Sequence, residues 1–395
     1  MTDAIQQLQL LHQDLSSSTD ERLSLLAAQS PLPPLTLRCA NNCAYRFSYD
    51  GKQLAIASVA ANDGILIDPE DWLGLTQDME AVPPLVYGNR LQCAAGELNK
   101  LLAWEPALRA IYRAIPVYDP NAPDLKDDTG TALDPTATYT LKDSPEAMRR
   151  VLNTLGYLVV HDVFAGDELQ RFRSYAQQLK ASARENDKQS WWGKNRKGES
   201  VLCRTLNGGE IDELAGLYDD PRIRQLAALM PAELKGANPR EQDGVTVIFK
   251  NPDMSEGLSD LPWHRDCGMG GHAVMCPTVI ISIYLYDATE EAGALRFLPA
   301  SHKASFGFLD AGDSKAPRGV RADARAGSVT LHYGDVMHAA PEPTGLCEHY
   351  RQSILLTYQP AYQHHRGDRH YNDILFNERE DGQVPNMKSL VDGDD

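Results

Sequence analysis

Two histidines and one aspartate, placed on distant stretches of the chain, restrict its fold more than any other feature. His264 and Asp266 are separated by one residue within the segment 262–266, and His338 lies far downstream. Residues i and i+2 of a β-strand project from the same face, so His264 and Asp266 can bind one ion if this segment is extended. Two histidines and one carboxylate form the facial triad of non-haem Fe(II) sites, which leaves coordination positions open. We therefore expect a fold that brings a second strand, carrying His338, beside the first.

The run that leads to His338 carries another candidate ligand. Residues 327–337 are β-prone and end in a Gly-Asp turn. His332 lies on this run and shares a face with His338 if the strand is regular. His332 is therefore the main alternative to His338 as the third ligand.

Residues 351–358 favour a further strand, on which Arg351 and Ser353 share one face. A guanidinium can bind a carboxylate through two parallel hydrogen bonds, and a hydroxyl two residues on can add another. This pair suits the distal carboxylate of 2-oxoglutarate.

The order of these segments is more specific than any one of them. Residues 262–266 are followed by the stretch 291–303, then by the glycine-led run to His338, then by Arg351. Over residues 141–360 this series resembles the phytanoyl-CoA dioxygenase family of iron- and 2-oxoglutarate-dependent oxygenases. The family's spacing between the leading glycine, here Gly327, and the third metal ligand favours His338 over His332.

The strand pattern also indicates the fold. Many short strands after a helical lead-in predict an α+β protein whose larger domain is a jelly roll, the cupin-like double-stranded β-helix. The nearly continuous apolar run 279–286 is typical of a strand inside such a sandwich.

The resemblance implies Fe(II) as cofactor, with 2-oxoglutarate and O2 as co-substrates. It implies decarboxylation of 2-oxoglutarate to succinate and CO2, coupled to oxidation of a C–H bond in a small-molecule substrate. Related halogenases lack the carboxylate ligand, so Asp266 favours hydroxylation or another oxidative C–H conversion. Two alternatives remain: a non-catalytic jelly-roll protein that binds a metal or ligand, and a peptide or protein hydroxylase, which would need a wide groove.

Three residues are candidates for contact with the substrate. Trp191 and Trp192 stand in a polar, glycine-containing stretch, 189–198, typical of a loop that can cover a substrate. The alternative is that both rings pack against the core. His272, in a glycine-rich stretch after Asp266, is a further candidate for the pocket.

Three other residues are candidates for binding 2-oxoglutarate. Arg204 lies where the family can place a basic residue near the co-substrate, and the alternative is a surface arginine. Thr246 shares one face of the strand 245–250 with Lys250, and either side chain could reach the co-substrate. The alternative is that both serve only the sheet.

The amino-terminal sequence predicts a separate, small α+β domain over residues 1–117. It contains a hairpin pattern at 43–59 and a helix that starts at Asp68. This region faintly resembles a sterol-carrier domain, which implies lipid binding and an apolar substrate such as an acyl chain, terpenoid, steroid or polyketide-like molecule. The alternative is a packing or dimerisation domain. Residues 118–143, rich in Asp, Pro and Thr, predict a linker, and residues 144–395 the oxygenase domain.

Composition excludes several classes of partner. A net charge of −17 would repel nucleic acids and anionic membranes. The seven cysteines are odd in number and scattered, which favours neither a disulfide framework nor a zinc site. No signal sequence or long apolar run is apparent. We expect a cytoplasmic protein with a small-molecule substrate, which could form homo-oligomers.

Overall fold

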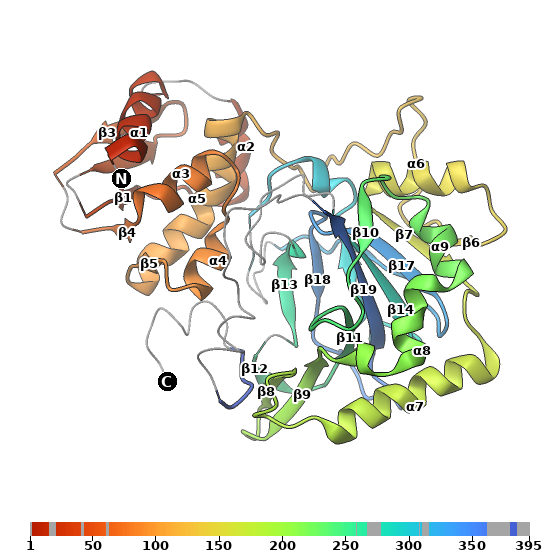
Figure 1. Cartoon of the computed structure of the whole chain (residues 1–395). Coiled ribbons are helices and arrows are strands. Elements are labelled where there is room, and N and C mark those ends of the chain that lie inside the picture. The colour runs from red at the N-terminus through yellow and green to blue at the C-terminus, as the bar shows by residue number, and fades with distance from the viewer. Residues whose placement is uncertain are drawn as a thin grey trace.

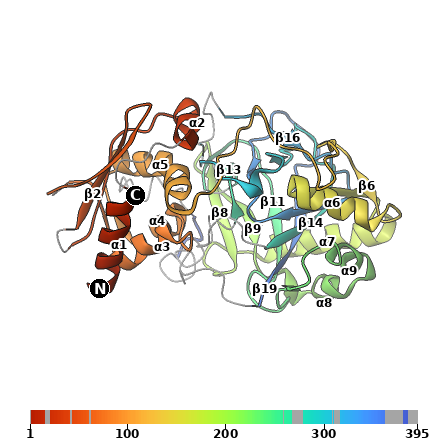
Figure 2. The ribbon, with the colours of Figure 1, turned by 90° about the horizontal axis from the view of Figure 1, so that it is seen from above.

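Two units make up the chain (Figures 1 and 2). The structure is a computed structural model, and it describes residues 2–15, 21–40, 43–60, 63–257, 259–266, 278–307, 309, 316–361 and 380–384. No helix in these ranges is both long enough and apolar enough to cross a membrane.

The amino-terminal unit is a mixed five-stranded sheet with helices, in the order β3-β2-β1-β4-β5. Strands β1 and β4 are parallel and the other neighbours are antiparallel. Its elements are α1 (Thr2–Leu15), α2 (Glu21–Gln29), β1 (Leu35–Arg38), β2 (Ala44–Tyr49), β3 (Leu54–Ser58), β4 (Ile65–Ile67), α3 (Pro69–Thr76), α4 (Val82–Tyr87), β5 (Leu91–Gln92) and α5 (Ala95–Arg113).

Local chemistry explains two of these elements. The hairpin β2–β3 turns at Asp50, whose carboxylate accepts hydrogen bonds from the backbone N–H groups of Lys52 and Gln53. Helix α3 begins with Pro69, and the side chain of Asp68 caps it by accepting from Glu70 N. The unit closes around its own apolar core, in which Phe47, Trp72 and Trp104 are fully buried. The α+β fold predicted for this part of the chain is therefore confirmed.

The second unit contains two sheets and a set of helices. Its elements are β6 (Tyr139–Thr140), α6 (Pro145–Leu155), β7 (Tyr157–His161), α7 (Gly166–Ser182), β8 (Ser190–Asn195), β9 (Ser200–Thr205), η1 (Gly208–Glu210), α8 (Asp212–Ala215), η2 (Gly216–Asp219), α9 (Pro221–Ala227), β10 (Leu234–Gly236), β11 (Val245–Phe249), β12 (Met254–Glu256), β13 (Leu261–His264), β14 (Val279–Tyr284), β15 (Arg296–Phe297), η3 (Ser301–Lys303), β16 (Val320–Arg321), β17 (Val329–Tyr333), β18 (His338–Ala340) and β19 (Gln352–Pro360).

The strands of the carboxyl-terminal half are divided between the two sheets. The large sheet has the order β12-β8-β9-β11-β19-β14-β17-β7-β6, with β10 paired to β19, and the small sheet has the order β13-β18-β15-β16. From β13 to β19 the chain crosses repeatedly from one sheet to the other. This topology is the predicted jelly roll, or double-stranded β-helix.

The large sheet has one face toward the helices and one toward the small sheet. Helices α6, α7 and α9 pack on the outer face around the main core of the unit (Figure 1). Residues opposite one another on paired strands point to the same face. The inner face therefore carries Thr246, Ile248, Ile280, Ser282, Thr330, His332, Ser353 and Leu355.

The segment 118–143 joins the two units and runs along the second one (Figure 2). At its start, Tyr118 is buried and its hydroxyl donates to Pro299 O at 2.9 Å. Near its end, β6 pairs in parallel with β7. In between, the Tyr157 hydroxyl donates to Pro135 O at 2.7 Å. The predicted linker is thus fixed to the jelly roll over much of its length.

Most of the stretch 189–198 is a strand, and the prediction of a covering loop was wrong there. Residues Ser190–Asn195 form β8, which pairs with both β9 and β12. Gly193 suggested a loop, but its role is close packing, because a Cβ there would lie 2.5 Å from Glu256 O. Gly198, at φ +77°, supplies the turn into β9.

Candidate metal centre

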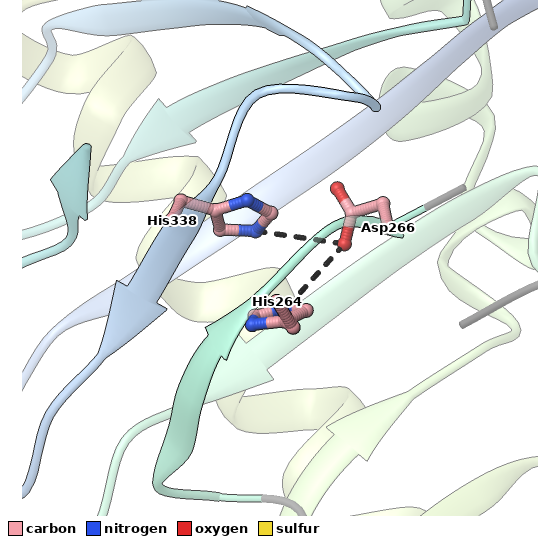
Figure 3. Close-up of side chains that lie close together, drawn as sticks. All are labelled: His264, Asp266 and His338. Carbon is pink, nitrogen blue, oxygen red and sulfur yellow. Dashed lines mark ion pairs between the residues drawn. The ribbon is translucent and has the colours of Figure 1, made fainter. Parts of the chain in front are cut away.

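Two strands of the small sheet bring the predicted triad together. Strand β13 ends at His264 and β18 begins at His338, and the two histidines are paired across the antiparallel strands. Asp266 follows β13 and turns back toward both rings (Figure 3). One ligand atom from each of the three residues lies within 4.8 Å of the other two.

The two imidazoles already present the nitrogen that a metal needs. The Nδ1 atom of His264 lies 2.7 Å from Pro262 O, and that of His338 lies 3.0 Å from Val336 O. A carbonyl oxygen only accepts, so Nδ1 carries the proton and the Nε2 lone pair is free for an ion. Both Nε2 atoms face Asp266 Oδ1, at 3.7 Å and 3.5 Å.

The electrostatics favour the ligand forms of these groups. Burial lowers the pKa of His264, and the neighbouring His338 lowers it further, which favours the neutral imidazole. For Asp266, burial alone would raise the pKa, but the adjacent imidazoles, His338 foremost, hold it well below its usual range. A carboxylate beside neutral imidazoles is the donor set that a divalent cation requires.

His332, the alternative third ligand, occupies a different position. It lies on β17 in the large sheet and reaches the triad from the opposite side. Its Nε2 is 3.2 Å from Asp266 Oδ2, the oxygen that does not face the other two rings. The side chain is buried, and its Nδ1 has no hydrogen-bond partner among the described residues.

The triad opens into a cavity of about 80 Å³ between the two sheets. His332, Arg204, Arg351 and Trp191 also line this cavity. The rest of the wall is mainly apolar and comprises Ile248, Leu261, Ile280, Leu295, Ala340 and Leu355, with Ser282.

Arg351 places a positive charge in this cavity. The residue is 3% exposed, and its Nε donates to Gly293 O at 3.0 Å. Its terminal nitrogens have no partner among the described residues. Burial lowers the pKa of Arg351, yet a guanidinium stays charged at neutral pH. A buried cation without a carboxylate partner is costly, so this position fits an anionic ligand.

Two buried hydroxyls on the same face of the sheet also have no partner. Ser353 Oγ and Thr246 Oγ1 are buried, and neither makes a hydrogen bond within the described ranges. Neither residue lines the cavity. Ser353 lies on β19, two residues after Arg351, which directly precedes the strand.

Of the other predicted site residues, Arg204 and Trp191 line the cavity, whereas Trp192 packs on the core. The Arg204 guanidinium stacks 4.7 Å from the centre of the Trp191 ring, and Nη2 pairs with Asp243 at 2.6 Å. Trp192 does not line the cavity; its indole N–H donates to Ser190 Oγ at 2.9 Å, and its ring packs on the main core. His272 lies outside the described residues.

Lys250 has the structural role that the sequence left open as the alternative to binding the co-substrate. It is fully buried, and its Nζ donates to Ser259 O, Asp260 and Ala340 O. Burial lowers the pKa of Lys250 to about 8, and pairing with Asp260 opposes that shift. Its three donors are thus satisfied next to strand β18 rather than directed into the cavity.

A double-stranded β-helix that holds two histidines and one carboxylate beside a buried guanidinium has the architecture of the non-haem iron oxygenases. The phytanoyl-CoA dioxygenase (PhyH) family model matches residues 152–347, a range that contains the whole triad and ends just before Arg351. This part of the chain therefore belongs to the PhyH family.

Several solved structures are similar to this chain. They include EvdMO1 (22% identity, TM-score 0.43), SnoK, a non-heme alpha ketoglutarate dependent carbocyclase from nogalamycin biosynthesis (20%, 0.46), and EctD from S. alaskensis with bound Fe (20%, 0.43). The alignments cover 55%, 63% and 58% of this chain and 50%, 96% and 82% of the respective neighbour. This chain thus spans half the length of EvdMO1. A search of curated proteins found no significant match.

Proposed function

We propose that this protein is an Fe(II)- and 2-oxoglutarate-dependent dioxygenase that hydroxylates, or otherwise oxidises, a C–H bond of a small apolar, acyl or natural-product substrate. The observation that carries this proposal is the buried Arg351, which faces the same cavity as the triad without a carboxylate partner among the described residues. A metal site and an unpaired cation in one cavity match a co-substrate that chelates the metal at one end and is anionic at the other.

His264, Asp266 and His338 are the proposed ligands of the iron. One carboxylate and two neutral imidazoles leave a net positive charge on a ferrous ion, so a dianionic co-substrate is favoured electrostatically. When bound, the iron with O2 and 2-oxoglutarate supplies the oxidant for the C–H bond, and succinate and CO2 are released. Three protein ligands leave coordination positions for the co-substrate and for O2.

The other residues bind and orient. Arg351 would hold the distal carboxylate of 2-oxoglutarate through its terminal nitrogens, with Ser353 and Thr246 as hydroxyl donors once their side chains are engaged. Arg204 extends the positive potential of this wall. The aliphatic lining keeps water away from the reacting atoms, and Trp191 is the proposed contact for the substrate.

Succinate formation tests the proposal. The purified full chain is incubated with Fe(II), 2-oxoglutarate and O2, without substrate and with a panel of acyl, terpenoid, steroid and polyketide-like compounds. We expect iron-dependent succinate that rises with a substrate and disappears in His264→Ala. The matched control is His161→Gln, a buried histidine bonded to Asp323 O, which should keep activity. Binding of metal and 2-oxoglutarate with no succinate from any compound would overturn the dioxygenase and assign a binding protein.

A further inference from the structure

Arg265 stands between the ligands His264 and Asp266 but does not line the cavity. Its side chain is buried, and its three hydrogen bonds to described residues all go to backbone carbonyls. Nε donates to Asp335 O at 3.2 Å, Nη1 to Phe306 O at 3.0 Å and Nη2 to Ala304 O at 2.9 Å. No carboxylate of the described residues lies within 4.0 Å of it. A buried guanidinium whose hydrogen bonds go to three carbonyls fixes the backbone geometry around it.

One of these bonds joins the two halves of the triad. Asp335 precedes His338 in the turn between β17 and β18, whereas Arg265 belongs to the segment that carries His264 and Asp266. The Arg265 side chain therefore connects the segment that carries His264 and Asp266 to the turn that precedes His338.

The other two bonds lead to the amino-terminal unit. Ser305, between the two acceptors Ala304 and Phe306, donates its N–H to Pro116 O at 2.6 Å and accepts from Tyr118 N at 2.9 Å. Its hydroxyl donates to Pro106 O, in helix α5, at 3.3 Å.

Packing reinforces this connection. The rings of Tyr118 and Phe306 meet edge to face at 5.7 Å, in a small apolar cluster that also contains Trp263 and Met337. These last two residues directly precede His264 and His338. Helix α5, Ser305, Arg265 and the metal ligands thus form one continuous path of contacts.

We propose that Arg265 is a positioning residue through which the amino-terminal unit sets the affinity of the metal centre. We call this arrangement the brace. The amino-terminal unit fixes the segment 304–306, and the carbonyls of that segment fix the Arg265 guanidinium. The guanidinium in turn fixes the position of β13 relative to the turn before β18. This inference rests on the proposed metal site, and it gives the amino-terminal unit a role that needs no ligand of its own.

Metal titration of the full chain tests the brace, with Co(II) and Mn(II) as probes and without substrate. Removing a residue that orients metal ligands typically weakens metal binding about 10- to 100-fold. We expect that loss in Arg265→Gln and a partial recovery in Arg265→Lys, which restores a buried donor. The matched control is Arg296→Gln in strand β15 of the same sheet, whose guanidinium pairs with Glu290 at 2.8 Å and makes no bond to the triad segments. It should bind metal as the wild type does.

A second variant tests the contact between the amino-terminal unit and the segment 304–306. Tyr118→Ala removes the ring that packs on Phe306 and leaves all three ligands and Arg265 in place. We expect metal binding to weaken about 2- to 30-fold, the range for mutations that alter coupling between sites. Tyr118→Phe, which loses only the hydroxyl, should have a smaller effect.

Thermal unfolding of the metal-free proteins separates positioning from stability. Variants that melt earlier but bind Co(II) with unchanged affinity would overturn the brace and leave the metal site standing. Unchanged affinity in Tyr118→Ala alone would overturn the role of the amino-terminal unit. If Arg265→Gln does not fold, Arg265→Lys and Tyr118→Ala decide the question. Failure of the wild type to bind any metal would overturn the proposed function, and this proposal with it.

Discussion

His332 Nε2 lies 3.2 Å from Asp266 Oδ2, while Asp266 Oδ1 faces the other two imidazoles. The two oxygens of one carboxylate are thus divided between a neighbour on the large sheet and the ligands on the small sheet. The hydrogen bond from His332 to Oδ2 fixes the rotation of the Asp266 carboxylate, so Oδ1 is directed at the metal position.

The first prediction concerns this contact. Replacing His332 by phenylalanine keeps a buried ring but removes the donor to Asp266. We expect Co(II) affinity to fall about 10- to 100-fold, because the carboxylate is free to rotate, with a smaller loss in His332→Gln, which can still donate. Isothermal titration of both variants measures this. Equal affinities in His332→Phe and the wild type would show that the contact does not orient the ligand.

Arg351→Lys separates co-substrate binding from metal binding. A lysine keeps the positive charge but cannot form two parallel hydrogen bonds to a carboxylate. We expect the KM for 2-oxoglutarate to rise about tenfold or more, since tenfold corresponds to about 1.4 kcal/mol. Co(II) affinity should stay at the wild-type value, because Arg351 touches none of the three ligands. A loss of metal affinity with an unchanged KM would place Arg351 outside the co-substrate site.

Burial of His302 predicts sensitivity to acid. Its pKa is lowered from 6.5 to about 4 by burial, so at lower pH the unfolded chain takes up a proton before the folded chain does. Stability from this group is complete above pH 6.5 and is lost as the pH falls toward 4. Between pH 7.5 and pH 5 the loss is on the order of 2 kcal/mol. His302→Gln should reduce the pH dependence of the free energy of unfolding, measured with urea, by that amount; an unchanged pH dependence would contradict the assignment.

Gly327, which opens strand β17, is predicted to tolerate no side chain. It has φ +80°, and a Cβ there would lie 1.9 Å from Phe164 O. Gly327→Ala should lower the free energy of unfolding by about 3 kcal/mol or more, from left-handed strain plus the clash with backbone. Gly130→Ala is the control, because its φ of +84° is similar and nothing lies within 4 Å of the added carbon. Gly130→Ala should lower the free energy of unfolding by only about 1–2 kcal/mol. Equal losses in Gly130→Ala and Gly327→Ala would show that the backbone moves to relieve the contact with Phe164 O.

The triad could be predicted from the sequence because its chemistry demands particular residues at spacings that strands allow. His264 and Asp266 had to share a strand end, and the jelly roll followed from the run of short strands. The contact of His332 with Asp266 could not be predicted from the spacing of residues in the sequence. The alternation of a strand places His332 and His338 on one face, but the chain crosses from the large sheet to the small one between them.

Contacts that depend on the backbone left no pattern in the sequence. Arg265 binds three carbonyls, and any residue can supply a carbonyl. Gly193 looked like a loop glycine because its close approach to Glu256 O arises only when β8 meets β12. Lys250 was placed on the correct face of its strand, yet only the structure shows that Ser259 and Ala340 bring acceptors to its amine.

The pairing of His264 with His338 across two hydrogen-bonded strands means that the register of the sheet sets the spacing of these two ligands. Small zinc domains unfold when a chelator removes their metal, because the ion and the fold depend on each other. Here the pairing of the strands, rather than the ion, holds the two histidines together. Removal of the iron by a chelator should therefore leave the chain folded and able to bind iron again.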